Sequence, residues 1–130
     1  MKKKVLSTFS ILLVLAALTA SLTTVQAAEP RYTGIAQIAS GLNISSSGRA
    51  ACYGKALLRD GYTANVTVVL KQDGVAIKTW TTSGSGMVII DESIYVMSGH
   101  EYVVTTIVTV HDSNGNWVES PSLDSATSTY

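Results

Sequence analysis

The chain has 130 residues with nine acidic side chains, nine basic side chains, two histidines and one cysteine. A lone cysteine excludes an internal disulfide, so packing and sheet hydrogen bonds must stabilise the fold. A zinc site would need more histidine or cysteine than the chain contains, and we expect no metal and no cofactor.

The first 27 residues have the pattern of a cleavable signal peptide. Lysines occupy positions 2–4, residues 11–20 are apolar, and small residues ending at Ala27 suit a signal peptidase. An apolar segment of ten residues is too short to span a bilayer. We therefore expect a secreted, extracellular protein in which residues 28–130 form a single domain with no membrane span.

Loss of the three lysines leaves the mature segment with six bases and nine acids, a formal charge of −3. This balance argues against nucleic acid and anionic lipid as partners. The last base is Lys78, and six acids follow it. Because the strands of a sandwich interleave, this segregation alone does not predict a charged face.

Seven strand-like segments follow the predicted signal peptide, and none has helical periodicity. The clearest is residues 64–81, where two β-branched runs flank Asp73-Gly74, the dipeptide best suited to a type I′ hairpin turn. Residues 83–86 read as a flexible crossover. We expect the other strands at residues 35–45, 49–58, 87–97, 102–111 and 116–128.

The turn at Asp73-Gly74 predicts the register of its hairpin. Leu70 would lie opposite Ile77, and Thr67 opposite Trp80; residues directly opposite share a face. The core face would carry Val66, Val68, Leu70, Val75 and Ile77. The solvent face would carry Thr67, Val69, Lys71, Lys78 and Trp80. A slip of one residue would bury the two lysines, so we expect Trp80 to point outward.

The last hairpin allows two registers. A two-residue loop would place Val110 opposite Glu119. A three-residue loop with a left-handed glycine would place Val110 opposite Val118 and His111 opposite Trp117. We prefer the second because it keeps the Glu119 carboxylate out of the core. Trp117 would then also point outward.

Residues 99–102, Gly-His-Glu-Tyr, resemble the tyrosine corner of immunoglobulin-like sandwiches, in which the Tyr102 hydroxyl would cap backbone. Cys52 stands where an antibody-type domain has its first cysteine, but Val104 replaces the second. The tight hairpin resembles the fibronectin type III-like arrangement. These resemblances imply an all-β, seven-stranded antiparallel immunoglobulin-like sandwich. One sheet (A-B-E) would hold the strands at 35–45, 49–58 and 87–97. The other (C′-C-F-G) would hold the two halves of 64–81, the second half at the edge, with 102–111 and 116–128.

Four further segments are similar to short secreted proteins of Gram-positive bacteria that are grouped as a domain of unknown function. This resemblance implies secretion and a β-sandwich, and it carries no activity. The segments are residues 59–63, 70–80, 98–100 and 112–115.

Catalytic and metal-binding patterns are weak. His100 and His111 have serines and acids nearby, as any chain rich in hydroxyl residues offers, so we do not expect an enzyme. Asp112 and the two asparagines after it alternate oxygens as a calcium loop does, but the terminal glutamate is missing, which favours a plain hairpin turn. Cys52 lies among small residues and is expected to be buried and inert.

The two registers together predict a binding face on one sheet. Its residues would be Trp80, Trp117, His111, Thr67 and Val69, with Ile107 beside them. Exposed tryptophans stack on sugars or pack against proteins. We therefore expect a non-catalytic module that binds a cell-surface glycan or protein, with a secreted toxin-like or bacteriocin-like effector as the alternative. The simpler interpretation is that each tryptophan only covers its neighbours.

Overall fold

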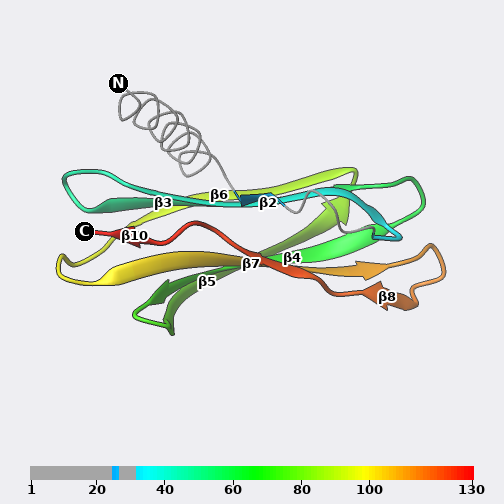
Figure 1. Ribbon diagram of the computed structural model, residues 1–130. Coiled ribbons are helices and arrows are strands. Elements are labelled where there is room, and N and C mark those ends of the chain that lie inside the picture. The colour runs from blue at the N-terminus through cyan, green and yellow to red at the C-terminus, as the bar shows by residue number, and fades with distance from the viewer. Residues whose placement is uncertain (1–24, 27–31) are drawn as a thin grey trace, which may run out of the picture.

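A computed structural model describes residues 25–26 and 32–130, which form two antiparallel sheets without a helix. The first sheet contains, in spatial order, β1 (Val25–Gln26), β2 (Ile35–Ile44), β3 (Arg49–Leu58) and β6 (Met87–Tyr95). The second contains β5 (Val75–Ser85), β4 (Thr63–Gln72) and β7 (Glu101–His111), followed by β8 (Trp117–Glu119), β9 (Ser122–Asp124) and β10 (Ser128–Thr129) on the other side of β7. Figure 1 shows the sheets as two stacked layers. The predicted all-β class is confirmed.

The predicted signal peptide lies outside the described residues except for β1. This short strand pairs with Ala39 and Ser40 at the edge of the first sheet, so cleavage after Ala27 would remove it from β2. In the part of the chain that the structure describes, no helix is long and apolar enough to cross a membrane.

The core lies between the layers, where alternate residues of β3, β4 and β7 point inward. Gly54 marks a close approach of the sheets: a Cβ there would clash with Val68 and lie 2.6 Å from Thr106 Oγ1. The same Thr106 hydroxyl donates to Ser40 Oγ at 2.9 Å, which links the sheets through buried polar groups. Among the fully buried residues are Ala50, Cys52, Ala56, Val66, Val68, Leu70, Tyr102, Val104, Val108 and Val110.

Cys52 is a free, buried thiol, as expected from its small neighbours. Burial in apolar surroundings raises the pKa of the thiol to about 12, since the thiolate would lose its hydration.

The hairpin of β4 and β5 begins with the predicted turn and then departs from the predicted register. Asp73 and Gly74 have φ values of 50° and 86°, as a type I′ turn requires. A β-bulge follows, so that Leu70 pairs with Lys78 and Val68 with Trp80. The predicted register is therefore wrong beyond the bulge by one residue, and Trp80 belongs to the core-facing side of β5.

The physical reason is the position of β5 at the edge of its sheet. Lys78 can lie on the core-facing side because an edge strand lets its side chain leave sideways into water. The indole of Trp80, half-buried, packs against the core. Val75 and Ile77, predicted as core residues, are instead 65% and 43% exposed on this outermost strand.

Two further departures concern connections. Residues 83–85 are not a flexible crossover, because they pair with residues 63–65 as the end of β5. Gly86 alone links β5 of the second sheet to β6 of the first, and its carbonyl accepts the Leu58 N–H at 2.8 Å. The predicted strand 116–128 is three short strands, and with β1 the described residues contain ten strands rather than seven. Pro121, which has no N–H to donate, lies at the first break.

The last hairpin has the predicted three-residue loop, with Gly115 at a φ of 83°. His111 lies opposite Trp117 as predicted, but a second bulge places Val110 opposite Glu119 rather than Val118. Glu119 is tolerated there because its two carboxylate oxygens accept the N–H groups of Thr33 and Gly34 at 2.9 and 2.8 Å. This carboxylate therefore joins β8 to the segment before β2.

Candidate functional site

The outer face of the second sheet, which points away from the core, carries four of the five predicted site residues. Thr67 lies between Thr81 of β5 and Ile107 of β7, and Val69 lies one step along the same strand. His111 pairs with Trp117 near the end of the sheet. We call this surface the outer face. It also carries Thr63, Asn65, Thr79, Ser83, Ser85, Thr105, Thr109 and Ser122.

Most side chains of the outer face are neutral and bear a hydroxyl or an amide. The Thr67 and Thr81 hydroxyls lie 3.3 Å apart across the β4–β5 pair. At the opposite edge the Thr105 hydroxyl donates to Asp124 Oδ1 at 2.6 Å. The face therefore offers donors and acceptors in regular rows, interrupted by the aliphatic Val69 and Ile107.

Trp117 is the large aromatic of this face, and its side chain is 62% exposed. The indole N–H donates to Ser120 Oγ at 2.8 Å within the same turn of chain, which restrains the ring. Its predicted outward position is confirmed. A restrained, exposed indole can stack on an apolar ring face at a small entropic cost.

Trp80 does not join this face. It pairs with Val68, whose side chain is fully buried, and its ring contacts the core. The Lys78 Nζ lies 5.9 Å from the centroid of the indole, within the range of a cation–π contact. The predicted binding face therefore has one tryptophan, Trp117, rather than two.

The loop that precedes β8 is a plain turn. The Asp112 Oδ1 atom accepts the N–H groups of Asn114 and Asn116, each at 2.9 Å. An oxygen that a calcium ion would need is thus used by the loop's own backbone. No group of three or more potential metal ligands occurs among residues 25–26 and 32–130.

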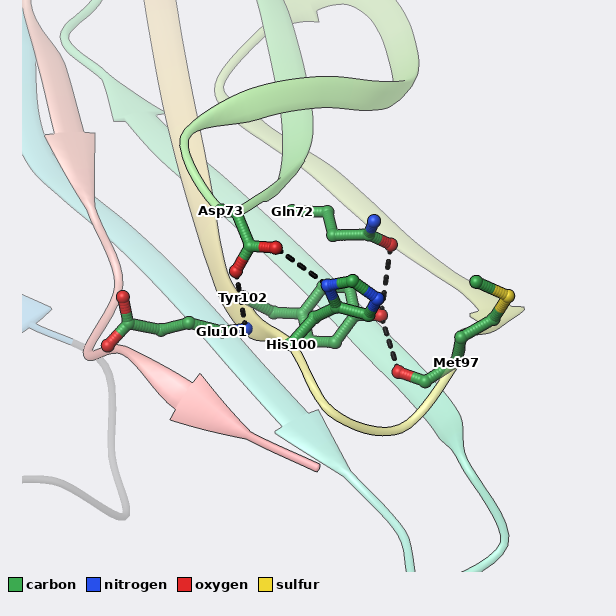
Figure 2. Close-up of polar contacts among 6 residues, drawn as sticks. All are labelled: Gln72, Asp73, Met97, His100, Glu101 and Tyr102. Carbon is green, nitrogen blue, oxygen red and sulfur yellow. Dashed lines mark hydrogen bonds and ion pairs between the residues drawn. The ribbon is translucent and has the colours of Figure 1, made fainter.

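The sequence did not indicate a contact between the β4–β5 turn and the start of β7. His100 Nδ1 lies 2.6 Å from Asp73 Oδ2, and the Glu101 N–H donates to Asp73 Oδ1 at 3.0 Å (Figure 2). Two hydrogen bonds hold the pKa of the Asp73 carboxyl below its usual range: the larger effect comes from the Glu101 N–H and the smaller from His100. The sequence indicated only that the turn at Asp73 follows one predicted strand and that His100 precedes another.

An open hollow of about 400 Å³ lies beside this pair, lined by Asp73, Gly99, His100, Glu101, Thr129 and Tyr130. Hydrolysis by a histidine–carboxylate pair needs a nucleophile bonded to the imidazole. In the described residues no serine or threonine hydroxyl is hydrogen-bonded to His100. The contacts of Asp73 with His100 and Glu101 tie the β4–β5 turn to the start of β7.

Tyr102 completes the tie. Its ring is fully buried, and its hydroxyl donates to the Met97 carbonyl at 2.6 Å and lies 3.1 Å from Gln72 Oε1 (Figure 2). The predicted capping of backbone by this hydroxyl is confirmed. The His100 ring meets the Tyr102 ring edge-on, with centroids 6.3 Å apart.

The site thus consists of a mostly neutral, hydroxyl-rich sheet face with one restrained indole at its end, and a separate His–Asp tie at the opposite end of β7. A scan of the chain against models of known protein families finds no match, and a search of curated protein sequences finds none either.

Proposed function

We propose that the protein is a secreted, non-catalytic module that binds a glycan or a protein of the cell envelope through the outer face. The observation that carries this proposal is the 62% exposure of Trp117 on a mostly neutral sheet face rich in hydroxyl groups. An exposed indole beside rows of donors and acceptors suits a ligand with both an apolar face and hydroxyl or amide groups.

Each predicted site residue has a role under this proposal. Trp117 stacks on the ligand and His111 hydrogen-bonds to it. Thr67 and Val69 form the floor of the contact further along the sheet. Trp80 stabilises the edge of the core and does not touch the ligand.

The proposal includes an immunoglobulin-like, fibronectin type III-like relationship for residues 28–130. Two features support it: the neighbouring order of β2, β3 and β6 in one sheet with β5, β4 and β7 in the other, and the hydroxyl cap of Tyr102. Domains of this architecture commonly serve as binding modules.

Binding to isolated cell envelopes of the producing organism tests the function. We expect Trp117→Ala to reduce retention at least about tenfold, the loss of roughly 1.4 kcal/mol of binding free energy, with an unchanged melting temperature. Tyr53→Ala is the matched control, because Tyr53 lies partly exposed on the outward side of the inner strand β3, in the other sheet. Envelopes treated with protease or with glycosidases distinguish the two ligand classes. Equal retention of both variants and the wild type would refute the proposal.

Secretion has its own test. The intact mass of the protein from culture supernatant should correspond to a chain beginning at Ala28 or Glu29. A chain that keeps residues 1–27 and stays with the cells would refute secretion while leaving the outer face open to the binding test.

A further inference from the structure

Two long strands, β5 and β6, have no partner on one edge in the part of the chain that the structure describes. Both lie on the same side of the sandwich, since β6 packs over β4 and β5 (Figure 1). We call this side the open side. An unpaired strand edge presents a row of N–H and C=O groups that can pair with another strand.

The open side and the chain just after it also carry most of the exposed apolar surface. Of the seven large hydrophobic residues that are exposed among residues 32–130, only Trp117 lies elsewhere. These side chains lie on or directly after the two unpaired strands, and exposed apolar side chains beside an unpaired edge favour a contact with another molecule. The six are Val75, Ile77, Met87, Ile89, Tyr95 and Met97.

The charges of the two strands are opposite. β5 carries a lysine and no acid, whereas β6 carries two acids and no base. Lys78 lies opposite Leu70 and Glu92 lies opposite Cys52, so each is on the core-facing side of its own sheet. Both side chains are nevertheless exposed, because their strands are outermost.

We propose that the open side is the interface of a symmetric dimer, in which β5 of one copy pairs with β6 of the other. The chain reverses at Gly86, so β5 and β6 run in opposite directions (Figure 1). A two-fold axis parallel to the strands would set β5 antiparallel to β6 of the second copy, and the same pairing would occur twice. The two sheets of one copy would continue into those of the other.

This arrangement places opposite charges together. Rotation about that axis aligns the first sheet of one copy with the second sheet of the other, and the core-facing sides of these two sheets then point in the same direction. Lys78 of one copy and Glu92 of the other then share a face of the joined sheet. Pairing β5 with β5 or β6 with β6 would instead bring like charges together, which destabilises a strand pair. The charge pattern therefore favours a second copy in the crossed arrangement.

The bulge at Ile77 limits which residues can pair. It interrupts the ladder near the start of β5 and leaves the segment from Lys78 to Ser85 as regular strand. This segment is nearly as long as β6, so eight or nine residues from each copy can form the joined sheet. Trp80 lies within it, and its emission reports on the contact.

Sedimentation and light scattering of the intact protein over a range of concentrations test the proposal through charge reversal. The wild type should be a dimer. Lys78→Glu and Glu92→Lys should each weaken association at least tenfold, because each substitution creates two like-charge contacts. An equimolar mixture of the two variants should restore the dimer, since every contact then joins opposite charges. Asp60→Lys, an exposed reversal in the β3–β4 turn, should leave the dimer unchanged.

Circular dichroism and thermal melting confirm that each variant is folded. In a Trp117→Phe background, the Trp80 emission should shift with dimerisation. A wild type that stays monomeric at about 100 μM, where weak but specific contacts are still populated, would overturn the proposal. So would a dimer that both single reversals leave intact, because its interface would lie elsewhere. Loss of envelope binding by Trp117→Ala has no bearing on this result.

Discussion

Removal of the Tyr102 hydroxyl measures how much the tie at the start of β7 contributes to stability. The Tyr102→Phe ring would keep its packing, since the side chain is fully buried and only one oxygen is lost. The Met97 carbonyl and Gln72 would each lose a partner. An unsatisfied buried polar group costs about 1–3 kcal/mol, and access of water to the partly buried Met97 carbonyl favours the lower half, about 1–2 kcal/mol.

Thermal and urea melts of the two proteins give this value directly. Each kcal/mol should lower the melting temperature by about 4–8 °C in a domain of this size. Tyr95→Phe removes the same atom from a ring that is 70% exposed and should change stability by less than about 0.5 kcal/mol. If the two variants melt together, the hydrogen bond to Met97 contributes nothing net and the reasoning is wrong.

Three other changes follow from the structure. The pKa of Asp73 is lower in the folded state, so the stabilisation from its carboxylate is present above the unfolded-state pKa of about 4 and is lost as the pH falls through the folded value. The difference in melting temperature between the wild type and Asp73→Asn should therefore disappear in acid. A difference that persists at low pH would contradict this. Since burial raises the pKa of Cys52 to about 12, the thiol should react with a disulfide reagent only when denaturant unfolds the protein, and rapid reaction of the native protein would show that it is accessible. Gly54→Ala should cost about 1–3 kcal/mol through its clash with Val68, whereas Gly84→Ala, whose Cβ would lie 3.5 Å from Val88, should melt close to the wild type.

The sequence predicted the central strands more accurately than the edges. Val66, Val68 and Leu70 share one parity of β4, which has a partner on both sides, and the other parity carries Thr67 and Lys71, so the positions of the polar residues identify the buried face. On β5, which has a partner on one side, the face depends on where a bulge forms. That position reflects the packing of Trp80 against the core, which no local pattern contains.

The candidate site was predicted in part for the same reason. The three-residue loop and its glycine were sufficient to place His111 opposite Trp117. The sequence favours a position outside the core for Glu119, because an unpaired carboxylate is costly there. Its partners, the N–H groups of Thr33 and Gly34, are 85 or more residues away in the sequence, so only the folded chain brings them together.

The single-residue link at Gly86 has a consequence for how the protein folds. β4 and β5 form a local hairpin, but β6 must pair with β3, whose residues lie some 30 or more positions earlier. Only Gly86 separates β5 from β6, so β6 lies close to the edge of β3 once the local hairpin has formed. Pairing of β6 with β3 then costs little further chain entropy. Formation of the second sheet thereby nucleates closure of the first. The two layers should therefore unfold in one cooperative transition, without an intermediate in which only one sheet is intact.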